Sequence, residues 1–179
     1  FAALMLLFFA IHLLTIAQVG INLDQNPLVA PNSVHMIFLV EVLLGVVGLL
    51  PAIIFVVNAA VRDHAQRMAE LIYTTQVARL PFLLGRFSAG TACASLVGLA
   101  GVLGTLTGTY MPWLDAERMT AFSWQPFAAV AALVVLPNLL VFCAFSFCVA
   151  VFTRTASFSF AMALAFVVRP IGTLVGMDI

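Results

Sequence analysis

Residues 42–61 read VLLGVVGLLPAIIFVVNAAV, and no charged side chain interrupts this stretch between Glu41 and Arg62. A helix needs about 20 mainly apolar residues to cross roughly 30 Å of hydrocarbon. A helix also pairs its own backbone polar groups, as lipid requires. The stretch therefore predicts a membrane-spanning helix. The whole chain of 179 residues agrees, because 64% of them are hydrophobic and only 8% are charged, where a soluble domain carries about 25%.

Further uncharged runs lie on both sides of this stretch and extend the prediction to five spans. A membrane barrel would show strict alternation of apolar and polar residues, and these runs do not. The fold class predicted is all-α, a polytopic α-helical membrane protein. The fifth run is short for a full crossing. The predicted spans cover residues 1–20, 36–61, 87–109, 125–152 and 155–168.

The connections between these spans differ in charge, and the difference predicts their sidedness. Residues 62–86 and the turn at 153–157 carry five Arg, whereas the loops at 21–34 and 110–124 carry one. Short loops rich in Arg face the cytoplasm. We therefore expect 62–86 on the cytoplasmic side and the other two loops outside. Three aromatic residues suit an aromatic belt at the outer interface: Tyr110, Trp113 and Trp124.

The sequence shows no motif for catalysis or for a bound metal. It lacks HExxH, GxSxG and a Gly-rich GK[ST] loop. The three Cys lie in apolar runs without CxxC spacing, which favours inert packing thiols over a redox or metal role. The net charge is zero and there is no Lys, so a nucleic-acid partner is not expected. We expect no enzyme activity, no metal and no cofactor in this chain. The three His lie in different segments: His12, His35 and His64.

The connection at 62–86 reads RDHAQRMAELIYTTQVARLPFLLGR and is the most informative segment. Within 62–73, apolar residues recur at i, i+3, i+4 and i+7, which predicts a short helix. Its charged residues fall mainly on the other side. Two interpretations remain open: an interfacial helix on the inner leaflet, or a docking element for a cytoplasmic partner.

The residues of this segment resemble the connection between the second and third spans of type-2 ABC transporter permeases. Gln76 stands where that pattern usually has Pro. Two downstream motifs, MPWLDAER at 111–118 and LPNLL at 136–140, are similar to a bacterial subgroup fused to a zinc aminopeptidase-like domain. The resemblance covers residues 1–168, and no peptidase signature occurs in the chain. The matching parts of the connection are Arg62-Asp63, Glu70-Leu71, Thr74–Arg79 and Leu83–Arg86.

The resemblance implies the permease subunit of an ATP-driven exporter in a bacterial inner membrane. It implies six spans per half, a second permease half as partner, and cytoplasmic ABC ATPase subunits that bind ATP and Mg. On this hypothesis the 62–75 helix passes ATPase closure to the second and third spans. The residues expected to couple to the ATPase are Arg62, Asp63, Arg67, Glu70 and Arg79.

Other interpretations of the chain remain open. It could instead be a membrane anchor or scaffold for a peptidase or assembly factor, without transport of its own. A pure anchor needs no polar or Pro-kinked residues at mid-depth. A secondary transporter is the weaker rival, because that class is expected to carry more intramembrane ionisable groups.

Five residues within the predicted spans are candidates for the transport path or a hinge. Glu41 is either an interfacial or paired acid, near the outer interface where water reaches it, or part of the path. Pro51 should kink its helix, and so should Pro137 together with Asn138. These kinks serve packing geometry or a hinge for alternating access. Asn58 either bonds a neighbouring helix or lines a pore.

The third predicted span is rich in small residues, with Gly98, Gly101 and Gly104 recurring every three. Such spacing predicts close packing against another helix, from the same chain or from another subunit. At the N-terminal end, Phe1 with no charged residues before the apolar run suggests a cut end rather than a signal peptide. At the C-terminal end, Arg169 and Pro170 break the fifth run. We leave 169–179 unassigned, with a junction of two pieces at Val168–Arg169 as one explanation.

Overall fold

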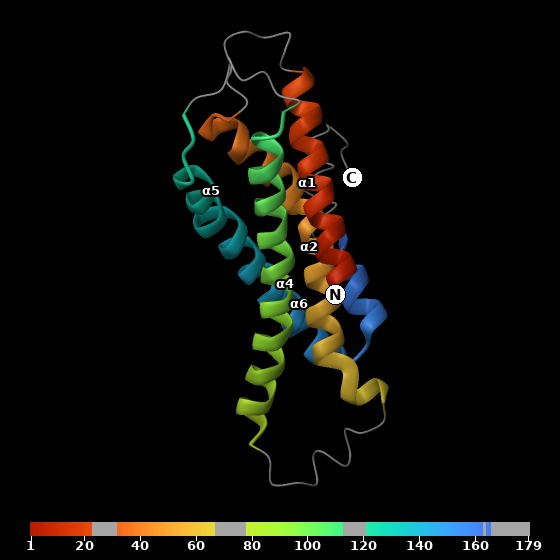
Figure 1. Cartoon of the computed structure of the whole chain (residues 1–179). Helices are drawn as coiled ribbons and strands as arrows, with labels where there is room; N and C mark the ends of the chain where they lie inside the picture. Colours follow the sequence, from red (N-terminus) through yellow and green to blue (C-terminus); the bar gives the residue numbers. More distant parts are fainter. Residues whose placement is uncertain (23–31, 67–77, 113–120, 163, 166–179) are drawn as a thin grey trace. The chain divides into compact units, whose positions relative to one another are not determined.

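A computed structural model describes residues 1–22, 32–66, 78–112, 121–162 and 164–165 of the chain (Figure 1). Over these residues the secondary structure is almost entirely helical, and they contain no strand. The all-α prediction is confirmed, with the helical architecture of a membrane protein. Residues 23–31, 67–77, 113–120, 163 and 166–179 lie outside the described part.

Within the described residues, three helical segments are long and apolar enough to cross a membrane. They are α2 (Val34–Ala65), α4 (Arg79–Thr109) and the continuous run at Gln125–Thr153. That run is built from α5 (Gln125–Val130), η3 (Ala131–Val135) and α6 (Leu136–Thr153).

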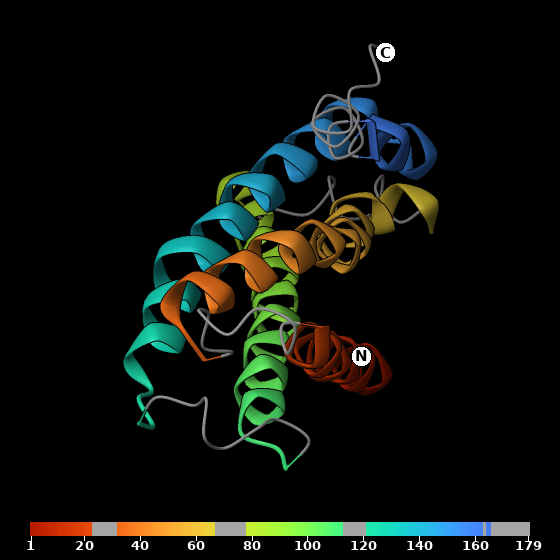
Figure 2. The same cartoon turned by 90° about the horizontal axis from the view of Figure 1, so that it is seen from above.

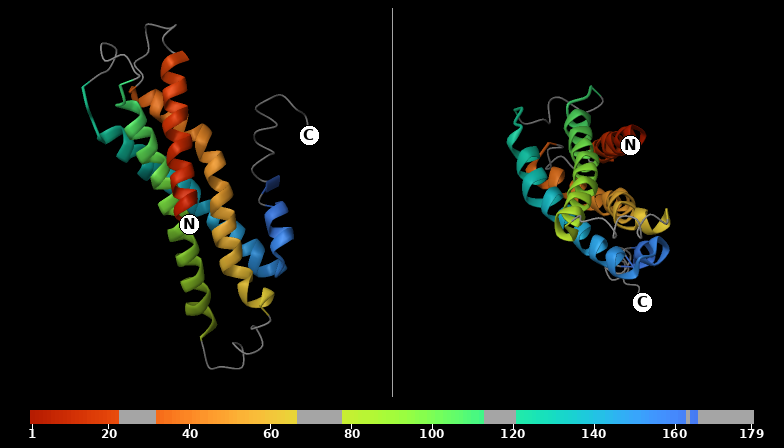
Figure 3. Two further views of the ribbon diagram at one scale, coloured as in Figure 1. Left: turned by 45° about the vertical axis from the view of Figure 1, so that its right-hand side comes forward. Right: turned by 90° about the horizontal axis from the view of Figure 1, so that it is seen from below.

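The other two predicted spans fall on shorter apolar helices. The first corresponds to α1 (Ala2–Asn22), whose described apolar part is Ala2–Gln18. The fifth corresponds to a helix described over 156–162, which follows the turn at Arg154 (Figure 3). Arg154 has φ 55°, the left-handed conformation that often ends a helix. A complete set of five crossings therefore remains a prediction.

The connection predicted at 62–86 is shorter in the structure, because both flanking helices extend into it. α2 continues to Ala65 and so includes Arg62 and Asp63. α4 begins at Arg79, eight residues before the predicted boundary at 87. Pro81 does not prevent this, since it stands in the first turn, where a missing N–H costs little. The segment between the two helices is thus 66–78, and each helix extends past the predicted span boundary, at 61 or at 87.

The chain divides into two compact units. The first unit contains residues 1–48 and 95–138, and the second contains 49–94 and 139–179. Each is described by itself below.

Close contact between α1 and α4 forms part of the first unit (Figure 2). A Cβ added at Gly104 would overlap the backbone carbonyl oxygen of Phe9, and one at Gly108 would overlap the side chain of Ile16. The two backbones therefore approach each other where α4 carries glycine. The predicted close packing of the small residues is confirmed here, and the neighbour is α1 of the same chain.

A second cluster of the first unit joins α2, α4 and α5. Its buried members are Ile37, Val102, Phe127 and Val130. The π-helical segment η3 follows, two residues before Pro137. Proline has no N–H and its ring crowds the carbonyl four residues earlier, which here belongs to Leu133. A π turn accommodates that disruption, so the predicted irregularity at Pro137 lies in η3.

The second unit packs α2, α4 and α6 around a small core. The buried members are Ala52, Val56, Ala94, Leu139 and Cys143. The rings of Phe87 and Phe147 lie edge to face beside it, with centroids 5.3 Å apart. Gly90 allows α4 close to α2, since an added Cβ would come 3.2 Å from the Cα of Val56.

Candidate functional site

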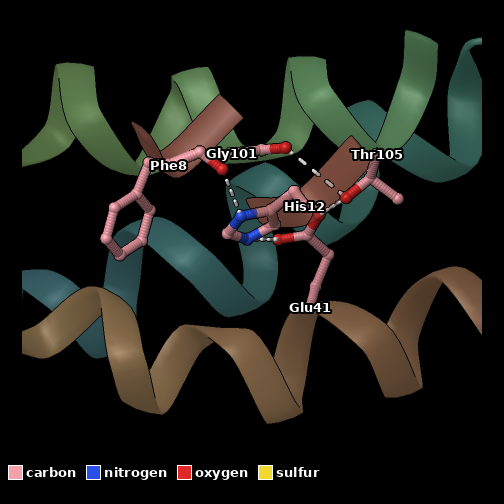
Figure 4. Close-up of polar contacts among 5 residues, drawn as sticks. All are labelled: Phe8, His12, Glu41, Gly101 and Thr105. Carbon is pink, nitrogen blue, oxygen red and sulfur yellow. Dashed lines mark hydrogen bonds and ion pairs between the residues drawn. The ribbon is translucent and has the colours of Figure 1, made fainter. Parts of the chain in front are cut away.

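Three polar side chains meet inside the first unit, although each comes from a different apolar helix (Figure 4). His12 is on α1, Glu41 is on α2 and Thr105 is on α4. Their exposed fractions are 3%, 2% and 0%. Together they form what we call the buried polar cluster.

Glu41 is held from one side by Thr105. The Oγ1 hydroxyl of Thr105 donates to Oε1 of Glu41 at 2.5 Å. The same hydroxyl lies 3.4 Å from the carbonyl oxygen of Gly101, one helical turn earlier on α4. Since the first contact is much the shorter, the threonine hydrogen points to the carboxyl group. One carboxyl oxygen is thereby satisfied without a charged partner.

His12 contacts the other carboxyl oxygen. Its Nε2 lies 3.7 Å from Oε2 of Glu41. On the opposite side of the ring, Nδ1 lies 2.9 Å from the carbonyl oxygen of Phe8. A carbonyl oxygen only accepts hydrogen bonds, so Nδ1 carries a hydrogen. The backbone of α1 thus fixes both the orientation of the ring and the nitrogen that faces Glu41.

Glycine on α4 creates the space that the imidazole occupies. A Cβ at Gly101 would come 2.7 Å from Cε1 and 2.8 Å from Nε2 of His12. A Cβ at Gly104 would come 3.1 Å from the Cβ of His12. On α1 itself, the ring of Phe8 lies 5.5 Å from the imidazole, centroid to centroid. The ring therefore lies between α4 and Phe8, with little free space on either side.

Glu41 is paired and buried, with an exposed fraction of 2%. Pairing was one of the two interpretations left open for this residue, and a part in the transport path stays a prediction. The burial differs from the expectation that water reaches this acid near the outer interface. Burying a carboxyl group away from water costs several kcal/mol unless hydrogen bonds compensate. An intramembrane acid retained at that cost is a candidate for function.

A second polar arrangement lies in the second unit, where α2 meets the start of α4. The Nη1 atom of Arg86 donates to the carbonyl oxygen of Ala59 at 2.7 Å. Its Nη2 atom donates to Oδ1 of Asp63 at 2.5 Å. The guanidinium group also lies 4.7 Å from the centroid of the Phe82 ring. We call this set of contacts the Arg86 clamp.

The residues predicted to couple to an ATPase are placed only in part. Arg62 is exposed at the end of α2, whereas Asp63 is paired with Arg86. Arg79 begins α4, and its side chain is not described. Arg67 and Glu70 lie outside the described residues.

The transport-path candidates fall in both units: the first contains Glu41, Pro137 and Asn138, and the second contains Pro51 and Asn58. Glu41 belongs to the buried polar cluster. Pro51 is buried within α2, which stays helical through it. Asn58, Pro137 and Asn138 are exposed.

Sequence reasoning missed His12, Thr105 and Arg86 as partners. A signal was present for His12, because it is the only ionisable side chain of α1, as Glu41 is the only acid in the first half of α2. When one apolar segment carries a single base and the next carries a single acid, the pattern indicates that these two side chains pair. The threonine carries no such signal, since α4 also contains Thr107 and Thr109 close by.

Comparison with protein-family models, curated proteins and solved structures gives no match to this chain.

Proposed function

We propose that this chain is a membrane-spanning permease subunit of an ATP-driven ABC exporter. ATP is then hydrolysed by partner subunits, which bind ATP and Mg in the cytoplasm. This chain converts the closure of those ATPase subunits into helix movement. A second permease half completes the pathway. The location proposed is a bacterial inner membrane, with six spans per half.

The observation that carries the proposal is the Arg86 clamp. It ties the last turns of α2 to the first turns of α4, on both sides of the connection at 66–78. A force applied to that connection therefore acts on two helices that are already joined. A coupling element needs this property, because it must bias the whole bundle between two packings.

The continuity of the helices supports the same proposal. α2 runs from Asp63 in the clamp to the half that carries Glu41, and α4 runs from Arg86 to the half that carries Thr105. A membrane anchor needs neither the clamp nor a buried acid, so both features favour transport over anchoring.

The test is an affinity pull-down of the detergent-solubilised protein, with ATPase activity assayed in the eluate. Glu70→Arg reverses a charge in the proposed docking segment. Glu117→Arg makes the same charge change in the predicted outer loop and is the matched control. We expect the unchanged protein and Glu117→Arg to bring down an ATPase, and Glu70→Arg to lose it.

Two results would overturn the proposal. If no ATPase elutes with any of the three proteins, coupling fails and the anchor interpretation replaces it. If Glu70→Arg and Glu117→Arg lose the ATPase equally, the docking segment is not where the partner binds.

A further inference from the structure

The hydrogen-bond geometry of His12 leaves one atom pair without a hydrogen between them. Nδ1 donates its hydrogen to the carbonyl oxygen of Phe8. In a neutral ring Nε2 then bears only a lone pair. That lone pair points at Oε2 of Glu41, 3.7 Å away. An ionised carboxyl group also offers only lone pairs, so the two atoms would repel each other.

The hydroxyl of Thr105 does not relieve this repulsion, because its hydrogen goes to the other carboxyl oxygen, Oε1. One added proton does relieve it. On Nε2, the proton makes an imidazolium whose positive charge faces the carboxylate across 3.7 Å, as in an ion pair. On Oε2, it makes a neutral carboxylic acid whose hydrogen faces the lone pair of the imidazole. In both cases the proton lies between the same two atoms.

No other described group of the first unit is placed to supply a compensating charge. α1 contains no ionisable side chain besides His12, and residues 95–109 of α4 contain none. The segments α5 and η3, which pack on α2 and α4, contain none either. His35, the other ionisable residue in the first half of α2, is exposed. An ionised Glu41 beside a neutral His12 would thus be an uncompensated buried anion, which is costly.

We infer that His12 and Glu41 together form a binding site for one proton inside the helical bundle. The proton belongs to the pair rather than to either residue. When it is bound, the pair is neutral overall and joins α1 to α2, while Thr105 joins α2 to α4. When it leaves, two facing lone pairs and a net negative charge remain, and the contact between α1 and α2 weakens. This inference stands on the cluster geometry alone and does not depend on a partner ATPase.

The chain allows a direct count of the proton, because it contains only three His and three Glu. Replacing His35, His64, Glu70 and Glu117 by Gln leaves His12 and Glu41 as the only residues of their kinds. This 179-residue chain is then labelled with ¹⁵N in His and with ¹³C at the Glu carboxyl carbon. Solid-state NMR in lipid bilayers reports the protonation state of both groups at neutral pH in one sample.

The expected result is one proton on the pair: either a doubly protonated ring with a carboxylate, or a singly protonated ring with a carboxylic acid. Adding Glu41→Gln should leave a neutral ring with its hydrogen on Nδ1. A neutral ring beside a carboxylate would overturn the inference, and so would a doubly protonated ring beside a carboxylic acid. Because these outcomes are read on the intact pair, they stand even if Glu41→Gln fails to fold.

Discussion

The hydroxyl of Thr105 donates to Oε1 of Glu41 at 2.5 Å, although 64 residues separate them in the sequence. Both groups lie on mainly apolar helices. The bond therefore fixes how α2 and α4 pack against each other in the first unit, and it keeps one oxygen of a buried carboxyl group satisfied.

Replacing Thr105 by Val keeps the shape of the side chain and removes the donor. Glu41 would then have an unsatisfied buried oxygen, which costs roughly 1–3 kcal/mol. We expect a lower thermal unfolding midpoint in detergent for Thr105→Val, and recovery for Thr105→Ser. The matched control is Thr107→Val, because that hydroxyl bonds only carbonyl oxygens of its own helix. If Thr105→Val and Thr107→Val lower the unfolding midpoint equally, the hydrogen bond to Glu41 adds no stability of its own.

A methyl group at Gly101 should disturb the same cluster from another side. Its Cβ would come 2.7 Å from Cε1 of His12, and overpacking of this kind costs about 1–3 kcal/mol. We expect Gly101→Ala to lower the unfolding midpoint and to change the ¹⁵N signals of the His12 ring. Gly45→Ala is the control, since its Cβ would meet no described heavy atom within 4 Å. Unchanged ring signals in Gly101→Ala would contradict the packing of His12 on α4.

The Arg86 clamp predicts energetic coupling between two residues at the ends of α2 and α4. Side chains of Arg86 and Asp63 are 22% and 14% exposed, so solvent screens the pair only in part. In a double-mutant cycle of Arg86→Gln and Asp63→Asn, the double variant should lose less stability than the two single losses added. We expect a coupling energy of about 0.5–3 kcal/mol. The exposed Arg154 is the control, and Arg154→Gln should add independently to Asp63→Asn. If the stability losses of Arg86→Gln and Asp63→Asn simply add in the double variant, the two side chains are not coupled and the clamp does not join α2 to α4.

Pro137 is expected to maintain the π turn of η3. An alanine there would supply the missing N–H and remove the clash with the carbonyl of Leu133, a defect that costs about 3 kcal/mol in an ordinary helix. Pro137→Ala should therefore raise the unfolding midpoint and return 131–135 to α-helical carbonyl chemical shifts. The matched control is Pro126→Ala, since Pro126 stands in the first turn of α5. If the π turn persists without Pro137, its cause lies in the packing instead.

The apolar composition and the length of the uncharged runs were enough to predict the helices. In lipid, a chain must pair its own backbone polar groups, and a helix does this. Their ends were less predictable. The charged residues Arg62 and Asp63 suggested an end at 61, yet Arg86 supplies a partner for Asp63 and for the carbonyl oxygen of Ala59. The helix therefore continues into the charged segment. A partner from a different helix cannot be seen in a local pattern.

The sequence identified one member of the buried polar cluster, Glu41, but not its partners. Glu41 was identified because an acid in an apolar run is costly. Its partners depend on the rotation of three helices about their axes, and glycines set that rotation by letting α1 approach α4. The glycine spacing predicted a close approach but named no neighbour, so His12 was not identified as facing Glu41.

The most direct test of the account is a photo-cross-link from the connection between α2 and α4 in native membranes. A photoreactive amino acid replaces Gln66, which is exposed just after the end of α2. The control carries it at Phe122, which is exposed and lies within the predicted outer loop at 110–124. We expect position 66, and not position 122, to give an adduct with a subunit that mass spectrometry identifies as an ABC ATPase. No ATPase adduct at position 66, or equal adducts at both positions, would contradict it.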